Sequence, residues 1–317
     1  KYIKEKHEKI VAEMKIQTQI LIDNYLPIAA TREIISSKKR NLWEREIDQE
    51  DFLDLRLGIG STELKGTINC PTESFSLDCD ELLKEVYKIK NDTKILENVP
   101  VSLSFAEKYI SAIIGTTATK QQFIDGLILQ MLTYHSYEDL KIVVFTTEKN
   151  SSNWEYLKIA PHCWSNDHMM RYYASNKDEA KEVSLALEKE LQARKYTEDS
   201  SGEKTLSTID YKSRKPYYVI FTDDYKEYRD IELIKDAAES KLNIGFSLIV
   251  ISPRLINIPN ECKAFISLGD KKSGIFENEL VSNKQKEFIA DYDPTLNMFE
   301  CAKQLANIPI DIAKQEQ

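Results

Sequence analysis

The sequence predicts an α/β fold in which helices cover both faces of a mostly parallel sheet, a three-layer sandwich. Three observations carry this prediction. An apolar run at 110–114 enters a short polar turn and then an apolar pattern at helical spacing. A second apolar run, at 217–221, ends in two aspartates. Further apolar runs at 140–146 and 246–251 alternate with helical patterns, as parallel sheets require.

Composition indicates a folded protein and excludes some functions. The chain has 317 residues, is 42% hydrophobic and contains 16 Tyr and 11 Phe, so it can bury a core and is not disordered. Its net charge of −9 argues against a nucleic-acid partner. Residues 1–40 carry nine Lys/Arg and five Asp/Glu, a basic segment on an acidic body. This asymmetry fits a position beside the cytoplasmic face of a membrane, or simply a solvated helix.

The cysteines and the hydropathy indicate the cellular compartment in which the chain is expected to lie. The five cysteines are scattered without a CxxC pair, which indicates a reducing compartment and gives no disulfide framework or zinc site. No apolar run is long enough to span a membrane, so the chain as given is expected to be soluble. It starts within a charged helix and ends in a polar tail, and we expect it to be a piece of something longer.

The first 40 residues predict a helical stalk. Residues at alternating steps of three and four form a heptad-like seam that ends near Pro27: Ile3, His7, Ile10, Met14, Gln17, Leu21 and Asn24. A short coiled coil and an amphipathic helix packed on its own domain both fit. Because fewer than four clean heptads are present, the pattern favours the packed helix.

Residues 41–100 predict a β-rich lead-in, and 101–317 the main domain. The lead-in contains strand patterns at 52–57 and 67–70 and a helical pattern at 80–89. The main domain opens with a strand at 101–105 and is predicted to contain helices at 154–159, 177–195, 231–241 and 296–305, a strand at 264–268 and a hairpin around 271–279. Residues 196–215 are polar and non-periodic, which predicts a loop or insertion.

The turn after residue 114 has the frame of a phosphate-binding loop. A complete Walker A loop reads G-x-x-x-x-G-K-[ST], and here Lys120 follows Gly115 one residue too early. Thr119 replaces the second glycine, and Gln121 replaces the Ser/Thr whose hydroxyl would bind Mg²⁺. The residues Gly115 to Lys120 therefore support two interpretations: a degenerate nucleotide site, or a turn that only keeps this shape.

The strand at 217–221 delivers Asp223 and Asp224 to the same kind of position. In a P-loop ATPase the first acid supports the Mg²⁺-bound water and the second activates the attacking water. Two acids at a strand end also serve as helix N-caps, the simpler alternative. Because both features occur in the expected order, the sequence favours a P-loop NTPase-like fold with a degenerate Walker A loop.

Two other groupings are interpreted as structural. His162, Cys163 and His168 match no familiar metal-binding spacing, so no metal site is predicted. His135, Ser136 and Asp139 have the residue types of a catalytic triad, but Ser136 lacks a nucleophile elbow, and the stretch is interpreted as a helix end.

Several stretches together resemble one family, the FtsK/SpoIIIE-type ATPases of type VII secretion, called EssC or EccC. They occur in the expected order across most of the chain and read LWEREIDQEDFLDLRLGIG, NVPVSLS, GTTATKQQF, HSYEDLKIVVF and WEYLKIAPHCW. The chain is similar to the membrane-proximal domain that precedes the first intact FtsK-like ATPase module. The loop looks like GTTGSGKS with one residue deleted.

The resemblance implies specific roles. It assigns nucleotide contacts to the degenerate loop residues Gly115, Thr116, Thr117, Thr119, Lys120 and Gln121, and Mg²⁺ support to Asp223 with Asp224 beside it. ATP and Mg²⁺ are the only cofactors it implies, and the departures from the motif place hydrolysis in doubt more than binding. A coupling module without its own hydrolysis and a weak ATPase active in the assembled oligomer are the two alternatives.

It also implies partners. These are other domains of the same chain, other membrane components of the secretion system, further copies in a homo-oligomer, expected to be a hexamer, and, indirectly, exported WXG100-type proteins. The expected location is the cytoplasmic face of the bacterial membrane, as part of a membrane-anchored protein.

Overall fold

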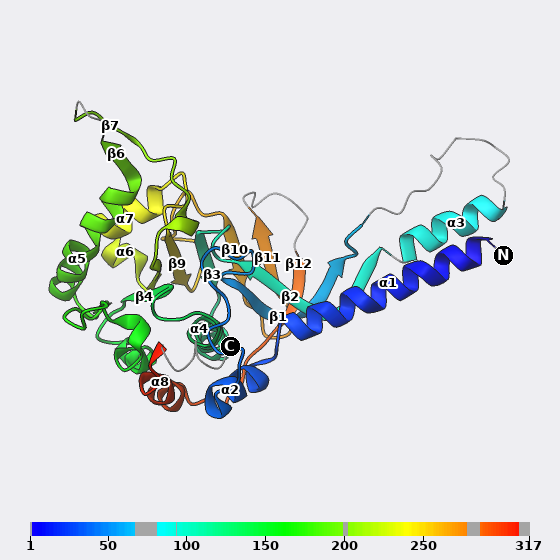
Figure 1. Ribbon diagram of the computed structural model, residues 1–317, viewed down its shortest axis with the longest axis horizontal. Coiled ribbons are helices and arrows are strands. Elements are labelled where there is room, and N and C mark those ends of the chain that lie inside the picture. Colours follow the sequence, from blue (N-terminus) through cyan, green and yellow to red (C-terminus); the bar gives the residue numbers. More distant parts are fainter. Residues whose placement is uncertain (1, 67–80, 93, 199–201, 278–285, 311–317) are drawn as a thin grey trace.

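One ten-stranded sheet organises the molecule (Figure 1). The computed structural model describes residues 2–66, 81–92, 94–198, 202–277 and 286–310. From one edge to the other, the sheet contains β2 (Ile95–Ser104), β1 (Asp54–Glu63), β12 (Lys286–Ala290), β11 (Ser273–Glu277), β10 (Ala264–Ser267), β3 (Ile110–Ile114), β9 (Phe246–Ser252), β8 (Tyr217–Thr222), β4 (Leu140–Phe145) and β5 (Tyr173–Ala174).

The sheet has a parallel part and an antiparallel part. All neighbours from β10 to β5 are parallel, whereas β10, β11, β12, β1 and β2 pair antiparallel. The predicted mostly parallel α/β architecture is thus confirmed. The strand β12 was not predicted, and the strand expected at 101–105 is the second half of the longer β2.

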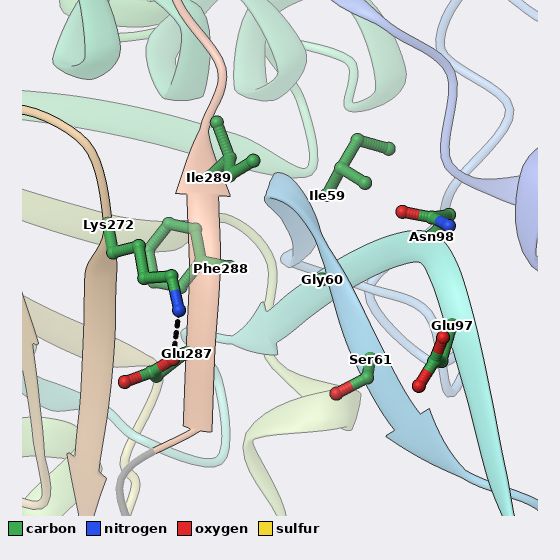
Figure 2. Close-up of a pocket in the computed structure, with 9 residues that line it drawn as sticks. All are labelled: Ile59, Gly60, Ser61, Glu97, Asn98, Lys272, Glu287, Phe288 and Ile289. Carbon is green, nitrogen blue, oxygen red and sulfur yellow. Dashed lines mark hydrogen bonds and ion pairs between the residues drawn. The ribbon is translucent and has the colours of Figure 1, made fainter.

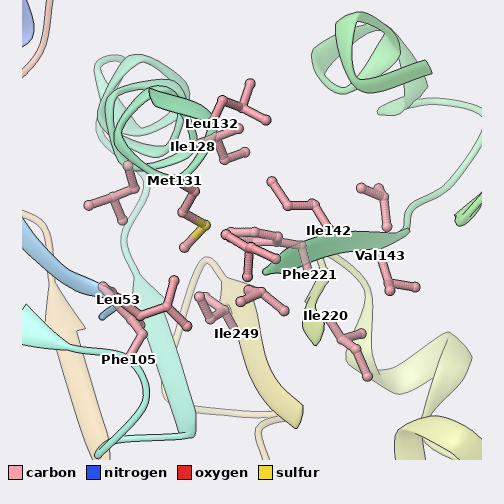
Figure 3. Packing of buried hydrophobic residues seen from close by; sticks show 14 of the residues in the cluster. Leu53, Phe105, Ile128, Met131, Leu132, Ile142, Val143, Ile220, Phe221 and Ile249 are labelled. Atoms are coloured by element: carbon pink, nitrogen blue, oxygen red, sulfur yellow. The ribbon is translucent and has the colours of Figure 1, made fainter. Parts of the chain in front are cut away.

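Helices pack against the sheet in two groups. The α4 helix (Lys120–Tyr134) contacts α2 (Ile28–Ser37) and α8 (Met298–Ala306), and α5 (Lys177–Lys195) contacts α7 (Glu232–Glu239). Successive side chains of a strand point to opposite faces of the sheet, so each strand can contact both groups of helices. In β4, Ile142 points toward α4 and Val143 points to the opposite face (Figure 3). The helix α6 (Tyr225–Tyr228) and the 3₁₀ turns η1 (Ser151–Asn153), η2 (Glu155–Lys158), η3 (Pro161–Cys163) and η4 (Tyr211–Ser213) complete this part.

The helix α1 (Tyr2–Asn24) projects from the body as an arm, near α3 (Glu81–Asp92) in Figure 1. Its predicted seam is the half-buried face of the helix, apart from the exposed Asn24. The side chain of Gln17 exchanges hydrogen bonds with the backbone of Lys65, just beyond β1, at 2.8 and 2.9 Å. No helix among the described residues is both long and apolar enough to cross a membrane.

Two buried arginines hold the base of this arm. Arg45 donates to the carbonyl of Asn24 (2.9 Å), and Arg56 donates to the carbonyl of Tyr25 (2.9 Å). Cations at a helix C-terminus satisfy its orphan carbonyls and complement the helix dipole. Arg56 also pairs with Asp291, just after β12, through a 2.6 Å contact. The arm is therefore connected directly to β1 and β12.

Some predictions need correction or cannot be tested. Residues 196–215 are not a structureless loop, because Tyr196–Glu198 (β6) and Lys204–Leu206 (β7) pair as a hairpin. Each strand has only three residues, and those of β7 are all exposed, so no apolar periodicity marks this pairing. The strand predicted at 67–70 lies outside the described residues.

A cavity of about 260 Å³ lies among β1, β2 and β12, in the antiparallel part (Figure 2). Its single cationic side chain, Lys272, already pairs with Glu287 at 3.1 Å, and Ile289 beside it is exposed. This cavity therefore presents no unpaired cation to an anionic ligand.

Candidate phosphate-binding site

The turn between β3 and α4 lies at the carboxyl edge of the parallel strands. Gly115 has a φ of 153°, and a Cβ at this position would lie 2.9 Å from the carbonyl oxygen of Leu268. Its N–H donates to the carbonyl of Ser252, the last residue of β9, at 3.1 Å. The chain thus needs glycine here, both for its backbone conformation and for its close approach to the segment after β10.

The rest of the turn accommodates the residues that depart from the motif. Thr119 has φ −88° and ψ 0°, so the shortened loop places no demand for a second glycine there. Thr119 makes no side-chain cap to α4. Among the described residues, the N–H groups of Gln121 and Gln122 have no acceptor. An uncapped helix N-terminus of this kind attracts an anion.

Two side chains of the turn add to this character. Lys120 is half-buried, and its ammonium group has no hydrogen-bond or ion-pair partner in the described part of the chain. The hydroxyl of Thr117 is buried and equally lacks a partner among the described residues. A phosphate group would satisfy both, since it offers acceptor oxygens and negative charge.

The side-chain amide of Gln121 is engaged by two neighbouring groups. Its amide donates to Oδ1 of Asp125 (3.0 Å) and to the carbonyl of Asn153 in η1 (3.4 Å). The position that carries the metal-binding hydroxyl in a complete motif is therefore engaged in contacts between α4 and η1. Sequence reasoning identified Gln121 as a departure but did not identify its partners.

Asp125, in α4, is an acid beside the turn that the sequence analysis did not identify as a site residue. Its Oδ1 also accepts from the hydroxyl of Tyr156 (3.1 Å). Burial raises the pKa of the Asp125 carboxyl to about 6, although the bonds from Gln121 and Tyr156 oppose this shift. The available signal was the only acid of α4, four residues after Gln121.

Asp223 lies at the same edge of the sheet as the turn. The strands β3 and β8 are parallel and separated only by β9, so their axes are roughly 10 Å apart. Two neutral groups hold Oδ2 of Asp223: the hydroxyl of Thr146 (2.9 Å) and the indole Nε1 of Trp154 (3.0 Å). Its Oδ1 is buried without a partner among the described residues, and burial raises the pKa of this carboxyl.

Asp224 has the simpler of the two predicted arrangements. Its side chain accepts from the N–H of Glu227 (3.1 Å) and so caps α6. The structure thus brings the turn and both acids to one edge of the sheet. Within the described residues, it joins neither acid to the turn by a hydrogen bond.

The donor set fits a phosphate group better than it fits Mg²⁺. Free N–H groups, an unpaired ammonium and an orphan hydroxyl suit phosphate oxygens. Mg²⁺ requires near-octahedral oxygen coordination. Here the amide of Gln121 is turned toward Asp125, and Trp154 and Thr146 donate to one of the two carboxylate oxygens of Asp223.

His135, Ser136 and Asp139, the residues with the types of a catalytic triad, make hydrogen bonds that hold the fold together. The N–H of Leu53 donates to Nε2 of His135 (3.1 Å), which assigns the proton of this ring to Nδ1. Ser136 donates instead to Asp139 (2.7 Å). His162 donates to the carbonyl of His135 (2.7 Å), and burial lowers the pKa of both histidines to about 3. His135 follows the last residue of α4, so the predicted helix end is confirmed.

Comparisons with known proteins give one answer. No protein-family model matches the chain. It is 22% identical over 320 residues to the type VII secretion system protein EssC of Staphylococcus aureus, covering 97% of this chain and 20% of that protein. It is 20% identical over 276 residues to the ESX secretion system protein EccC of Geobacillus thermodenitrificans, covering 86% and 18%.

The fold agrees with these relatives. A solved structure of ATPases 2 and 3 of EssC from Geobacillus thermodenitrificans has a TM-score of 0.50 and 12% identity, covering 88% of this chain and 53% of that one. The chain spans about a fifth of the length of the curated relatives it matches. It is homologous to the EssC and EccC type VII secretion proteins over most of its own length, and its fold is that of their P-loop NTPase-like domains.

Proposed function

We propose that the chain is an ATPase-like coupling module of a type VII secretion motor and does not hydrolyse ATP itself. The homology to EssC and EccC supports the secretion role. The arm formed by α1, held by Arg45 and Arg56 against the sheet, supports the coupling role. In this proposal the module lies at the membrane-proximal, cytoplasmic end of a longer membrane-anchored protein, and the domain boundaries near 40 and 100 mark the stalk and the lead-in.

The partners follow from the same proposal. The module contacts the downstream ATPase modules of its own chain and other membrane components of the secretion system. It assembles with further copies into a ring, with a hexamer as the expected state, and serves the export of WXG100-type proteins indirectly. It binds no nucleic acid, in keeping with its net charge of −9.

The observation that carries the absence of hydrolysis is the engagement of the metal-side residues. In phosphoryl transfer, Mg²⁺ neutralises the charge that develops on the transferred group, and losing its placement costs orders of magnitude in rate. Here Gln121 is bonded to Asp125 and Asn153, and Asp223 accepts from Trp154. These contacts would have to open before Gln121 or Oδ2 of Asp223 could take part in holding a metal.

Isothermal titration of the chain with Mg-ATP tests this proposal. We expect no measurable binding heat for the Mg²⁺ complex, because the residues that would hold the metal are engaged by other groups. A micromolar dissociation constant would show that the site accepts the metal complex and would contradict the proposal. If heat appears, Lys120→Ala distinguishes binding in the turn from binding elsewhere. Lys189→Ala, which removes an exposed lysine of α5, is the matched control for the lost charge.

The unpaired ammonium of Lys120 and the orphan hydroxyl of Thr117 favour a second candidate, a weak ATPase active only in the assembled oligomer. In this case a neighbouring copy would supply the missing positive charge, such as an arginine. Turnover by a longer assembled protein, with its other ATPase modules disabled, measures this activity. We expect Lys120→Ala to abolish it and Lys189→Ala to retain it; an unchanged rate in Lys120→Ala would refute the candidate.

A further inference from the structure

A second pocket lies beside the phosphate-binding turn, between α4, the 3₁₀ turns η1 and η2, and the start of α8. Its volume is about 370 Å³, within the range of small-ligand sites. The lining residues are Gln121, Asp125, Ser152, Asn153, Tyr156, Leu296, Asn297, Met298 and Phe299. Asp125 is the only Asp, Glu, Lys, Arg or His among these lining residues. The described lining of the pocket therefore has one acidic side chain and no cationic one.

The carboxylate of Asp125 is only half satisfied. Its Oδ1 accepts from Gln121 (3.0 Å) and Tyr156 (3.1 Å). Its Oδ2 has no hydrogen-bond partner among the described residues and is not sealed from the pocket, because it is absent from the buried orphan atoms of this part of the chain. No described lysine or arginine forms an ion pair with it. A largely buried carboxylate without a cation is costly, and a cation that enters the pocket would offset this cost.

We propose that this pocket binds a primary alkylammonium group, with Oδ2 of Asp125 as the anionic acceptor. An ammonium needs one charged acceptor and a few neutral ones, and Ser152 and Asn297 line the same pocket. Oδ1 of Asn297 accepts from the N–H of Glu300 (3.2 Å) and has a second lone pair. A guanidinium fits less well, because its bidentate pairing uses both carboxylate oxygens and Oδ1 already accepts two hydrogen bonds.

The walls of the pocket suit the alkyl part and the charge. The rings of Tyr156 and Phe299 meet edge to face with centroids 6.3 Å apart. Aromatic rings stabilise a nearby ammonium through their π faces. Phe299 remains 41% exposed, and Leu296 and Met298 complete the apolar side. The ligand thus enters from the surface at Phe299, with its charged end toward Asp125.

Methionine methyl NMR of the whole chain tests the proposal with n-butylammonium as the probe. Met298 lines the pocket, while Met14, Met131, Met169 and Met170 do not and serve as internal controls. We expect a saturable shift of the Met298 methyl signal alone, with a dissociation constant on the order of 1 mM for so small a ligand. The neutral n-butanol is the matched probe. Equal responses to both probes would overturn the proposal.

Two variants separate the carboxylate from general charge. Asp125→Asn keeps an acceptor for Gln121 and Tyr156, so the fold is expected to persist, and it should weaken butylammonium binding at least tenfold. Asp293→Asn removes a nearby, partly exposed acid outside the pocket and should bind as the wild type does. Unchanged affinity in Asp125→Asn would refute the site. The butanol comparison on the wild type decides the question even if that variant unfolds.

The ammonium could come from a free polyamine or from a lysine side chain of a polypeptide. Titration with cadaverine and with Nα-acetyl-lysine methylamide distinguishes these sources, because the tighter binder identifies the better fit. Binding of either supports the ammonium site, and binding of neither overturns it. This inference does not depend on the proposed function, since the assay contains no nucleotide and reads out only Met298.

Discussion

The indole nitrogen of Trp154 lies 3.0 Å from Oδ2 of Asp223, and this contact links the 3₁₀ segment after β4 to the end of β8. Trp154 is 1% exposed, and its ring packs against that of Phe221 in β8, with ring centroids 5.5 Å apart. The acid that the sequence suggests as a metal-side residue therefore has a buried protein donor. Any rearrangement that frees Asp223 must also move Trp154.

Trp154→Phe removes this donor while keeping an aromatic ring. Hydrogen bonds to charged groups contribute about 1.5–3 kcal/mol, so we expect a loss of roughly 2 kcal/mol in the free energy of unfolding, measured with urea. Trp164→Phe is the control, since its indole donates to the uncharged carbonyl of Lys158 at 3.0 Å. This variant should lose about 1 kcal/mol in the free energy of unfolding, because a hydrogen bond between neutral groups contributes about that much. Equal losses would show that Asp223 gains nothing special from Trp154.

Gly115→Ala tests the requirement for glycine at the entry of the turn. The added Cβ combines an unfavourable φ with a 2.9 Å approach to the backbone oxygen of Leu268. We expect a loss of roughly 3 kcal/mol in the free energy of unfolding. Gly66 has a φ of 123° but open space around it, so Gly66→Ala isolates the conformational cost, roughly 1 kcal/mol. A similar cost for both variants would contradict a steric role for Leu268.

Arg56→Met tests the base of the arm. Arg56 is 8% exposed, and its loss leaves Asp291 and the carbonyl of Tyr25 without their donor. Breaking a buried pair from one side costs about 3–5 kcal/mol, and we expect the lower end because Asp291 is partly exposed. Lys272→Met breaks the exposed pair with Glu287 and should cost less than about 1 kcal/mol. Chemical denaturation of both variants measures the difference.

Asp125→Asn should change how stability depends on pH. The pKa of Asp125 is about 6 in the folded protein, above its ordinary value of 3.8, so the folded state holds the proton more tightly than the unfolded state does. This carboxyl therefore favours folding at low pH, and that contribution is lost as pH rises from about 4 to about 6. Tyr156, the other titratable group bonded to it, has a pKa raised well above its usual value and stays neutral in this range.

The variant lacks this titration. Relative to the wild type, its free energy of unfolding should therefore rise between pH 4 and pH 6.5, by roughly 2 kcal/mol. Denaturation at a series of pH values measures this difference. A difference that is flat across the range would show that Asp125 titrates normally.

The sequence predicts the parallel part of this fold because its signals are local. Buried parallel strands appear as continuous apolar runs, and both Gly115 and the acids after β8 mark strand ends. The hairpin at 196–206 pairs locally, but its three-residue strands are too short for a periodicity to appear. The strand β12 pairs with β1, which lies near the other end of the sequence. A periodicity search has no access to such partners.

The site shows the same division. The loop departures at Thr119 and Gln121 are visible in the sequence, but their consequences depend on tertiary contacts. Thr119 is unstrained because the shortened loop avoids positive φ. Gln121 is engaged because α4 and η1 place Asp125 and Asn153 beside it. The roles of these residues toward a nucleotide stay predictions.

The anchoring of α1 has a mechanical consequence. A helix of 23 residues is roughly 35 Å long, and here two guanidinium groups bind the carbonyls at its C-terminal end, while Gln17 bonds to the backbone of Lys65. The helix can therefore transmit force to the sheet through the residues that hold its C-terminal end. A sideways displacement at its N-terminal end would exert a torque on β1 and β12, so the antiparallel strands would respond first to motions far from the body of the molecule.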